Sequence, residues 1–128
     1  HYYLDGGLAD SVPFERAMKK GCDKNIVVLT RAHGYVKKTD RVTKMTEKLY
    51  KKYPKIVESL DTRAERYNAC MKKLYELEKE GKVFIIAPDD TYGVGRTETD
   101  TKLLGRLYQE GYDIAKREMP KLKEYLKG

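Results

Sequence analysis

The sequence is poor in the side chains that carry most nucleophilic and metal-assisted chemistry. Its 128 residues include two cysteines, two histidines, two serines and no tryptophan. Cys22 and Cys70 have no metal-ligand spacing and form no close pair, so we interpret them as buried free thiols in a reducing compartment. His1 and His33 are far apart in the sequence and have no carboxylate cluster to join them. We therefore expect neither a metal site nor a cofactor.

The two serines do not have the surroundings of a catalytic nucleophile. Neither Ser11 nor Ser59 lies in a Gly-x-Ser-x-Gly sequence, the strand-turn-helix arrangement that exposes a serine hydroxyl. Ser11 is better placed to cap a helix that begins at Pro13. The sequence therefore predicts no nucleophile of its own.

Long apolar runs are also missing. No stretch approaches the roughly 20 residues of a membrane-spanning helix, and no signal-peptide core is visible. Hydrophobic residues still make up 40% of the chain and charged residues 37%, which is enough apolar material for a core. We expect one domain, or part of one, in the cytoplasm.

Positive charge is concentrated in one window. The chain has a formal net charge of +7, and residues 31–56 contain nine basic and two acidic side chains, which account for the whole excess. Two interpretations stay open: a solvated helix face, or a non-enzymatic module that contacts an anionic membrane surface or nucleic acid. Nucleic acid is disfavoured because no nucleic-acid-binding fold pattern is visible. The candidate contacts are Lys37, Lys38, Arg41, Lys44 and Lys48.

Apolar patterning predicts an α/β fold in the order β-α-β-α-α-β-α, with about three parallel strands flanked by helices. The uninterrupted apolar runs in the second and third strands predict burial on both faces of the sheet. Glycine and proline mark most of the helix ends. Strands are expected at 2–4, 25–30 and 83–87, and helices at 13–20, 42–53, about 60–80 and about 99–118, with Pro120 kinking or restarting the last helix.

The two longest predicted helices each have one apolar face. In the first, the apolar positions are Leu60, Ala64, Tyr67, Met71, Leu74 and Leu77. In the second, the expected inner face consists of Leu104, Leu107, Tyr108, Gly111 and Ala115.

An acidic corner near the start of the sequence is the strongest candidate site. Asp5 follows the apolar run at 2–4 and precedes Gly6 and Gly7. A carboxylate at the end of a buried strand needs hydrogen bonds, which the backbone of a Gly-Gly turn can supply. The alternative is an aspartate that only forms the turn.

Several sequence runs, spread in order over nearly the whole chain, carry a family resemblance. The run Tyr3-Leu4-Asp5-Gly6-Gly7-Leu8-Ala9-Asp10-Ser11-Val12-Pro13 resembles the Asp-Gly-Gly/Ala motif of bacterial patatin-like phospholipases. The resemblance continues through 25–31, Gly34-Tyr35-Val36-Lys37-Lys38, Tyr53-Pro54, Arg63 with Tyr67-Asn68, 80–88 and 107–112.

This resemblance implies a catalytic mechanism. The family hydrolyses lipid acyl esters with a Ser–Asp dyad, in which the aspartate, here Asp5 of the Asp5-Gly6-Gly7 motif, is the general base. A glycine-rich loop supplies the oxyanion hole. The activity implied is that of a phospholipase A or esterase in lipid degradation.

The resemblance also implies that part of the catalytic unit lies elsewhere. The family's Gly-x-Ser-x-Gly sequence and its oxyanion loop precede the Asp motif, and this sequence contains neither. We therefore expect the C-terminal half of a patatin-like three-layer fold, with 1–31 ending the phospholipase domain and 32–128 forming an α/β extension with a helical C-terminal part. The expected partner is an N-terminal half that carries the serine. Alone, the chain should be inactive and should associate with a second copy through its incomplete sheet.

Overall fold

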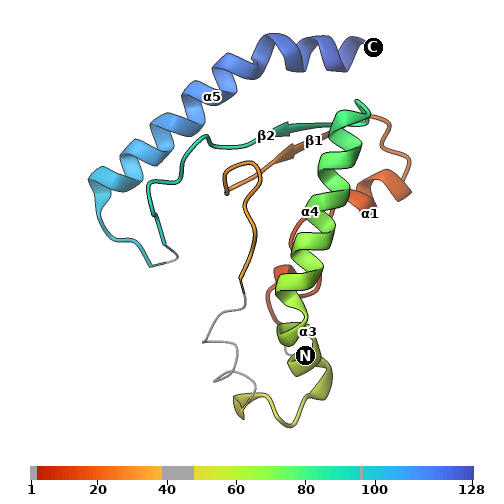
Figure 1. Ribbon diagram of the computed structural model, residues 1–128, viewed down its shortest axis with the longest axis vertical. Coiled ribbons are helices and arrows are strands. Elements are labelled where there is room, and N and C mark those ends of the chain that lie inside the picture. Colours follow the sequence, from red (N-terminus) through yellow and green to blue (C-terminus); the bar gives the residue numbers. More distant parts are fainter. Residues whose placement is uncertain (1–2, 39–47, 96) are drawn as a thin grey trace.

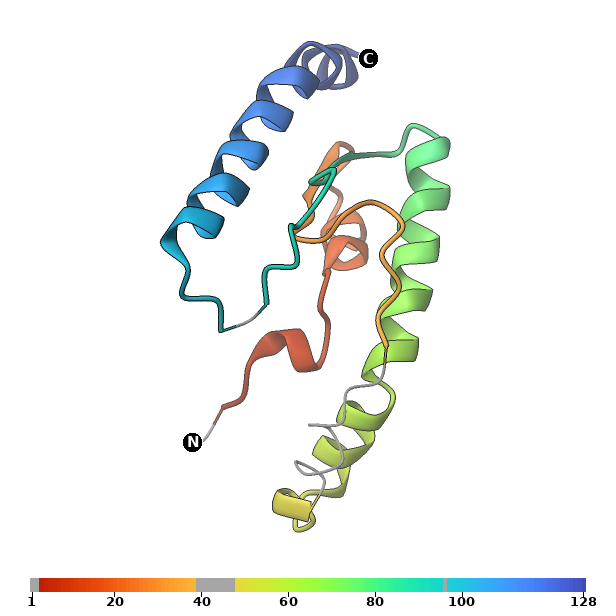
Figure 2. The same ribbon diagram turned by 60° about the vertical axis from the view of Figure 1, so that its left-hand side comes forward.

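The computed structural model describes residues 3–38, 48–95 and 97–128, which form a mixed α/β structure that is mostly helical. Two strands lie between the two long helices, as Figures 1 and 2 show from two directions. In chain order, the elements are the 3₁₀ helix η1 (Gly6–Leu8), α1 (Phe14–Lys19), β1 (Asn25–Val28), α3 (Pro54–Asp61), α4 (Arg63–Lys79), β2 (Val83–Ile86) and α5 (Thr101–Lys127).

The sheet consists of β1 and β2 in parallel, with Asn25 opposite Val83 and Val28 opposite Ile86. Parallel strands need a long crossover, and α3 and α4 lie in the connection between these two. One face of both strands packs against α4 and α1. The resulting core consists of Phe14, Val27, Leu29, Met71, Leu74, Val83 and Ile85.

The other face of the sheet is only half covered. Helix α5 packs against β2, where the rings of Phe84 and Tyr125 lie 5.6 Å apart between centroids. The corresponding side chains of β1 stay open, since Ile26 is 44% exposed and Val28 is 70% exposed. The expectation that the 25–30 run is buried on both faces is therefore wrong, because α5 does not cover β1.

The predicted third strand at 2–4 is also absent over its described residues. Tyr3 and Leu4 are exposed and lie outside any strand, so the described part of the chain contains two strands. An apolar run of this length forms a strand only when a neighbouring strand accepts its backbone hydrogen bonds.

The helix predicted at about 60–80 is confirmed as α4, with Ala64, Met71 and Leu74 buried. The predicted inner face of the last helix is confirmed only in part, since Leu107 and Ala115 are half-buried. The buried residue is Ile114, which was not predicted, whereas Leu104 and Tyr108 are exposed. Half of the helix predicted at 42–53 lies outside the described ranges, and the described residues 50–53 form a turn rather than a helix. Over those ranges, no helix is both long enough and apolar enough to cross a membrane.

Pro120 lies inside α5, and the helix continues past it and bends in its C-terminal part (Figure 1). A proline in a helix removes one backbone hydrogen bond, so other contacts must hold the last turns. Tyr125 supplies them at the starts of the two strands. Its hydroxyl accepts from Asn25 N (3.0 Å) and donates to Lys82 O (3.0 Å).

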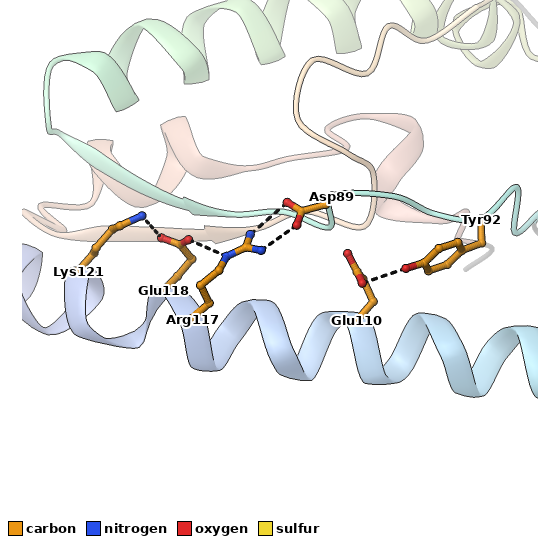
Figure 3. Close-up of polar contacts among 6 residues, drawn as sticks. All are labelled: Asp89, Tyr92, Glu110, Arg117, Glu118 and Lys121. Carbon is orange, nitrogen blue, oxygen red and sulfur yellow. Dashed lines mark hydrogen bonds and ion pairs between the residues drawn. The ribbon is translucent and has the colours of Figure 1, made fainter.

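The middle of α5 is held by polar contacts to the segment after β2, drawn in Figure 3. Arg117 forms a bidentate pair with Asp89, with N–O distances of 2.8 and 3.1 Å. These hydrogen bonds lower the pKa of Asp89. Nearer the start of the helix, the Tyr92 hydroxyl donates to Glu110 at 2.9 Å.

We expect the chain to associate with itself through β1. Its outer edge has no partner among the described residues, and Ile26 and Val28 present an apolar face beside that edge. Sedimentation velocity should show an average mass that rises with concentration. Val28→Lys should shift the chain toward monomer, because a charge on an exposed strand opposes edge pairing. Val36→Lys is the matched control, since Val36 is exposed in a loop. A monomer at every concentration, or equal effects of both substitutions, would contradict this expectation.

Candidate functional site

The Asp5 carboxylate is held in a tight local turn. Its Oδ1 accepts a hydrogen bond from Gly7 N at 2.8 Å, which caps η1, and its backbone oxygen accepts from Leu8 N at 3.0 Å. A Cβ atom at position 7 would lie 3.2 Å from Asp5 Oδ1, so the carboxylate can turn back this far because residue 7 is glycine. A Cβ atom at Gly6 would meet nothing within 4 Å.

Asp5 is oriented but not buried. We expected it at the end of a buried strand, and that expectation is wrong: both Asp5 and the preceding Leu4 are exposed. Its carboxylate is therefore open to a group that approaches from outside the described residues.

Arg66 of α4 fixes this turn to the rest of the fold. Its guanidinium donates to the backbone oxygens of Leu8 (2.9 Å) and Ala9 (2.7 Å), which directly follow Gly7. The same group also donates to the backbone oxygen of Ser59 at 2.7 Å and to Thr62 Oγ1 at 3.1 Å. One side chain thus connects the Asp5 turn, the end of α3 and the start of α4.

Replacing Arg66 with glutamine is expected to release the turn. The free energy of unfolding should fall by about 1 kcal/mol, since several charge-assisted hydrogen bonds are lost at an exposed position. Backbone amides at Leu8 and Ala9 should exchange with solvent faster, measured by hydrogen–deuterium exchange. Arg16→Gln removes the same charge from an exposed position on α1. Equal exchange rates in the two variants would show that Arg66 does not hold the turn.

Arg63, one turn earlier on the helix, lies beside the same corner. Its Nη2 atom would lie 4.0 Å from a Cβ at Gly7, and its Nε atom is buried without a hydrogen-bond partner among the described residues. Arg63 lines two cavities: one of about 40 Å³ beside Asp10 and Cys70, and one of about 500 Å³ that runs along β1.

Both serine hydroxyls already form hydrogen bonds, and the thiol of Cys70 is partly buried. Ser11 Oγ donates to Gly7 O at 2.8 Å, and Ser59 Oγ accepts from Arg66 at 3.2 Å. Burial raises the pKa of the Cys70 thiol, which disfavours the reactive thiolate. Cys22 is exposed rather than buried as we expected. Within the described ranges no three histidine, cysteine or carboxylate side chains gather as metal ligands.

The basic window is only partly described. Lys38 and Lys48 are exposed, and Arg41 and Lys44 lie outside the described residues. Lys37 is held against α4, because Asn68 accepts from its backbone N at 2.8 Å and donates to its backbone O at 3.0 Å. Lys37 therefore lies in a segment that packs along α4, and it does not belong to a solvated helix face.

Sequence reasoning missed the structural roles of Arg63, Arg66 and Asn68. Arg63 and Asn68 entered it only through the family resemblance, and Arg66 did not enter at all. One pattern in the sequence could have indicated these roles. The polar residues at 63, 66 and 68 lie next to apolar positions at the start of α4. Such side chains lie beside the core and can reach loops that cross the helix.

The comparison with protein families gives one match, which covers α3, α4, β2 and α5. Neither the curated proteins nor the solved structures gave a match. The matching family is described as "Domain of unknown function (DUF6363)", and it spans residues 53–127. The Asp5 turn, α1 and β1 precede the matched residues. The chain belongs to this DUF6363 family.

Proposed function

We propose that this chain is the C-terminal part of a patatin-like serine hydrolase and that Asp5 is the general base of its Ser–Asp dyad. The observation that carries the proposal is the state of the Asp5 carboxylate, which is oriented by Gly7 N at 2.8 Å and still exposed. A general base needs both a fixed direction and an approach path for the hydroxyl whose proton it accepts.

The proposed serine belongs to a segment outside residues 1–128. Ser11 and Ser59 form hydrogen bonds within the described fold, and neither lies in a Gly-x-Ser-x-Gly sequence. A serine brought within hydrogen-bond reach of Asp5 would transfer its proton to the carboxylate as its oxygen attacks the ester carbonyl. The covering segment would also exclude water, which strengthens the electrostatic interaction between the two groups.

The half-covered sheet supports the same arrangement. The patatin-like fold has three layers, and here α4 covers one face while α5 leaves β1 open on the other. A further part of the sheet would pair with the outer edge of β1 and cover Ile26 and Val28. We propose lipid acyl esters as substrates and residues 1–31 as the end of the catalytic domain.

The replacement of Asp5 by asparagine tests the proposal. It keeps the size of the side chain and an oxygen that can accept from Gly7 N, but it removes the basic carboxylate. A protein that contains both the serine and this chain should lose most of its ester hydrolysis, whereas its fold should stay intact.

A further inference from the structure

The large cavity along β1 has an uneven charge distribution. Its volume is about 500 Å³, and its lining residues include three cationic side chains, Arg31, Lys37 and Arg63, and no aspartate or glutamate. Apolar side chains such as Val12 and Phe14 line another part of it. A cavity with cations and no lining carboxylate is suited to an anionic group.

Two tyrosines bring the three cations together. The Arg31 guanidinium lies 5.3 Å from the ring centroid of Tyr35, and Lys37 Nζ lies 5.5 Å from that of Tyr67. The two rings are themselves 6.1 Å apart. Arg63 precedes Tyr67 by four residues on α4, so the two side chains share one face of the helix. The cations thus surround the same pair of rings.

The charge of Arg63 has no partner among the described residues. Its Nε atom is buried and has no hydrogen-bond partner among the described residues, and Arg63 forms no ion pair within them. Since no described carboxylate pairs with this guanidinium, its charge is left to attract an anion in the cavity that Arg63 lines.

The segment that carries Arg31 and Lys37 is anchored before any ligand binds. His33 Nε2 lies 3.0 Å from Glu78 Oε2, and Gly34 N donates to the Tyr75 hydroxyl at 2.9 Å. Asn68 binds both backbone groups of Lys37. Arg31 follows the carboxyl end of β1, the end of a parallel sheet where α/β folds bind their ligands.

We propose that Arg31, Lys37 and Arg63 form a binding site for a phosphate group. A phosphomonoester carries nearly two negative charges and three acceptor oxygens, which suits three cations better than a single carboxylate does. Burial raises the pKa of Tyr67, so its hydroxyl keeps the proton that it can donate to such a group. The proposal does not depend on the catalytic role of Asp5, because none of these residues is part of the dyad.

A titration with inorganic phosphate tests the site. The ¹⁵N–¹H spectrum of the chain is recorded at constant ionic strength, with potassium chloride replaced by potassium phosphate. Saturable shifts are expected at the amides of Arg31, Lys37 and Arg63. Arg63→Gln and Arg31→Gln should each weaken binding by about tenfold, the loss of one charge-assisted contact. Arg16→Gln removes the same charge from a residue that does not line the cavity and should leave the affinity unchanged.

A second arm separates the two sources of the group. The chain is sedimented with phosphatidylcholine vesicles that contain either phosphatidic acid, a phosphomonoester, or phosphatidylglycerol, a phosphodiester. Preference for phosphatidic acid that Arg63→Gln abolishes would assign a lipid headgroup, whereas a response to inorganic phosphate alone would assign a free phosphate. If Arg63→Gln fails to fold by circular dichroism, Arg31→Gln decides. The proposal is overturned if neither probe binds saturably, or if the cavity variants bind as Arg16→Gln does.

Discussion

Truncation of Leu74 to alanine is expected to lower the free energy of unfolding by about 2–5 kcal/mol. Leu74 is 0% exposed and lies on α4 at the centre of the core against both strands. The change removes three carbon atoms from packed surroundings and leaves a cavity that the short strands can close only in part. Urea denaturation, followed by far-ultraviolet circular dichroism, measures the loss.

The core is small, so this loss is a large share of the total. The buried hydrophobic residues of the described chain number nine, and a domain of this size has only about 5–15 kcal/mol of stability. Leu126→Ala is the matched control, because Leu126 is 50% exposed near the end of α5. A loss in the Leu74 variant no larger than in the control would show that α4 does not hold the sheet.

Replacement of Asp5 by asparagine is expected to lower kcat/KM for ester hydrolysis by about 10²–10⁴-fold in a protein that also carries the proposed serine. An amide cannot accept the hydroxyl proton, although its oxygen can still accept the hydrogen bond from Gly7 N. The turn should therefore keep its shape while the base is lost. Hydrolysis of a p-nitrophenyl ester gives the rate, and residues 1–128 alone serve as the blank.

Asp10 provides a close control for this experiment. It is also an exposed aspartate in the same loop, and its Oδ1 accepts from Val12 N at 3.2 Å, as Asp5 accepts from Gly7 N. Asp10→Asn therefore makes the same chemical change in a similar local geometry. Full turnover in the Asp5 variant, or an equal loss in both, would remove Asp5 from the role of base.

Local patterns in the sequence predicted those elements whose neighbours lie on the same helix. The apolar repeat from Ala64 to Leu74 predicted the buried face of α4, because that face is set by residues three and four apart. The last helix has two apolar stripes, one with Leu104 and Tyr108 and another with Leu103, Leu107 and Ile114. Periodicity cannot choose between such stripes, since the choice depends on which one meets β2.

Contacts between distant residues account for what the sequence did not predict. The sequence of β1 is typical of a strand that is buried on both faces. Its second face would be buried only if α5 extended over it, and α5 packs on β2 instead. Pro120 is compatible with a helix end, but Tyr125 binds the strand starts and the helix continues. The Asp5 turn is also held by a residue that is distant in the sequence, since Arg66 contacts Leu8 and Ala9 across more than 50 residues.

The candidate site likewise has one part that local sequence predicted and one part that depends on contacts between distant residues. The Asp5-Gly6-Gly7 turn was predictable because an aspartate commonly caps the backbone N–H two residues later. The cavity with Arg31, Lys37 and Arg63 was not, since it forms only when the segment after β1 packs along α4. The sequence showed Arg31 and Lys37 as part of the basic window at 31–56, and Arg63 only through the family resemblance.

The most direct test of the proposed dyad is the rate at which a fluorophosphonate labels the nucleophilic serine in a protein that contains both parts. This reagent reacts with an activated serine and needs no knowledge of the natural ester. The account predicts rapid labelling in the native protein and in Asp10→Asn, and labelling slower by about 10²-fold or more in Asp5→Asn. Equal labelling rates in all three proteins would contradict it.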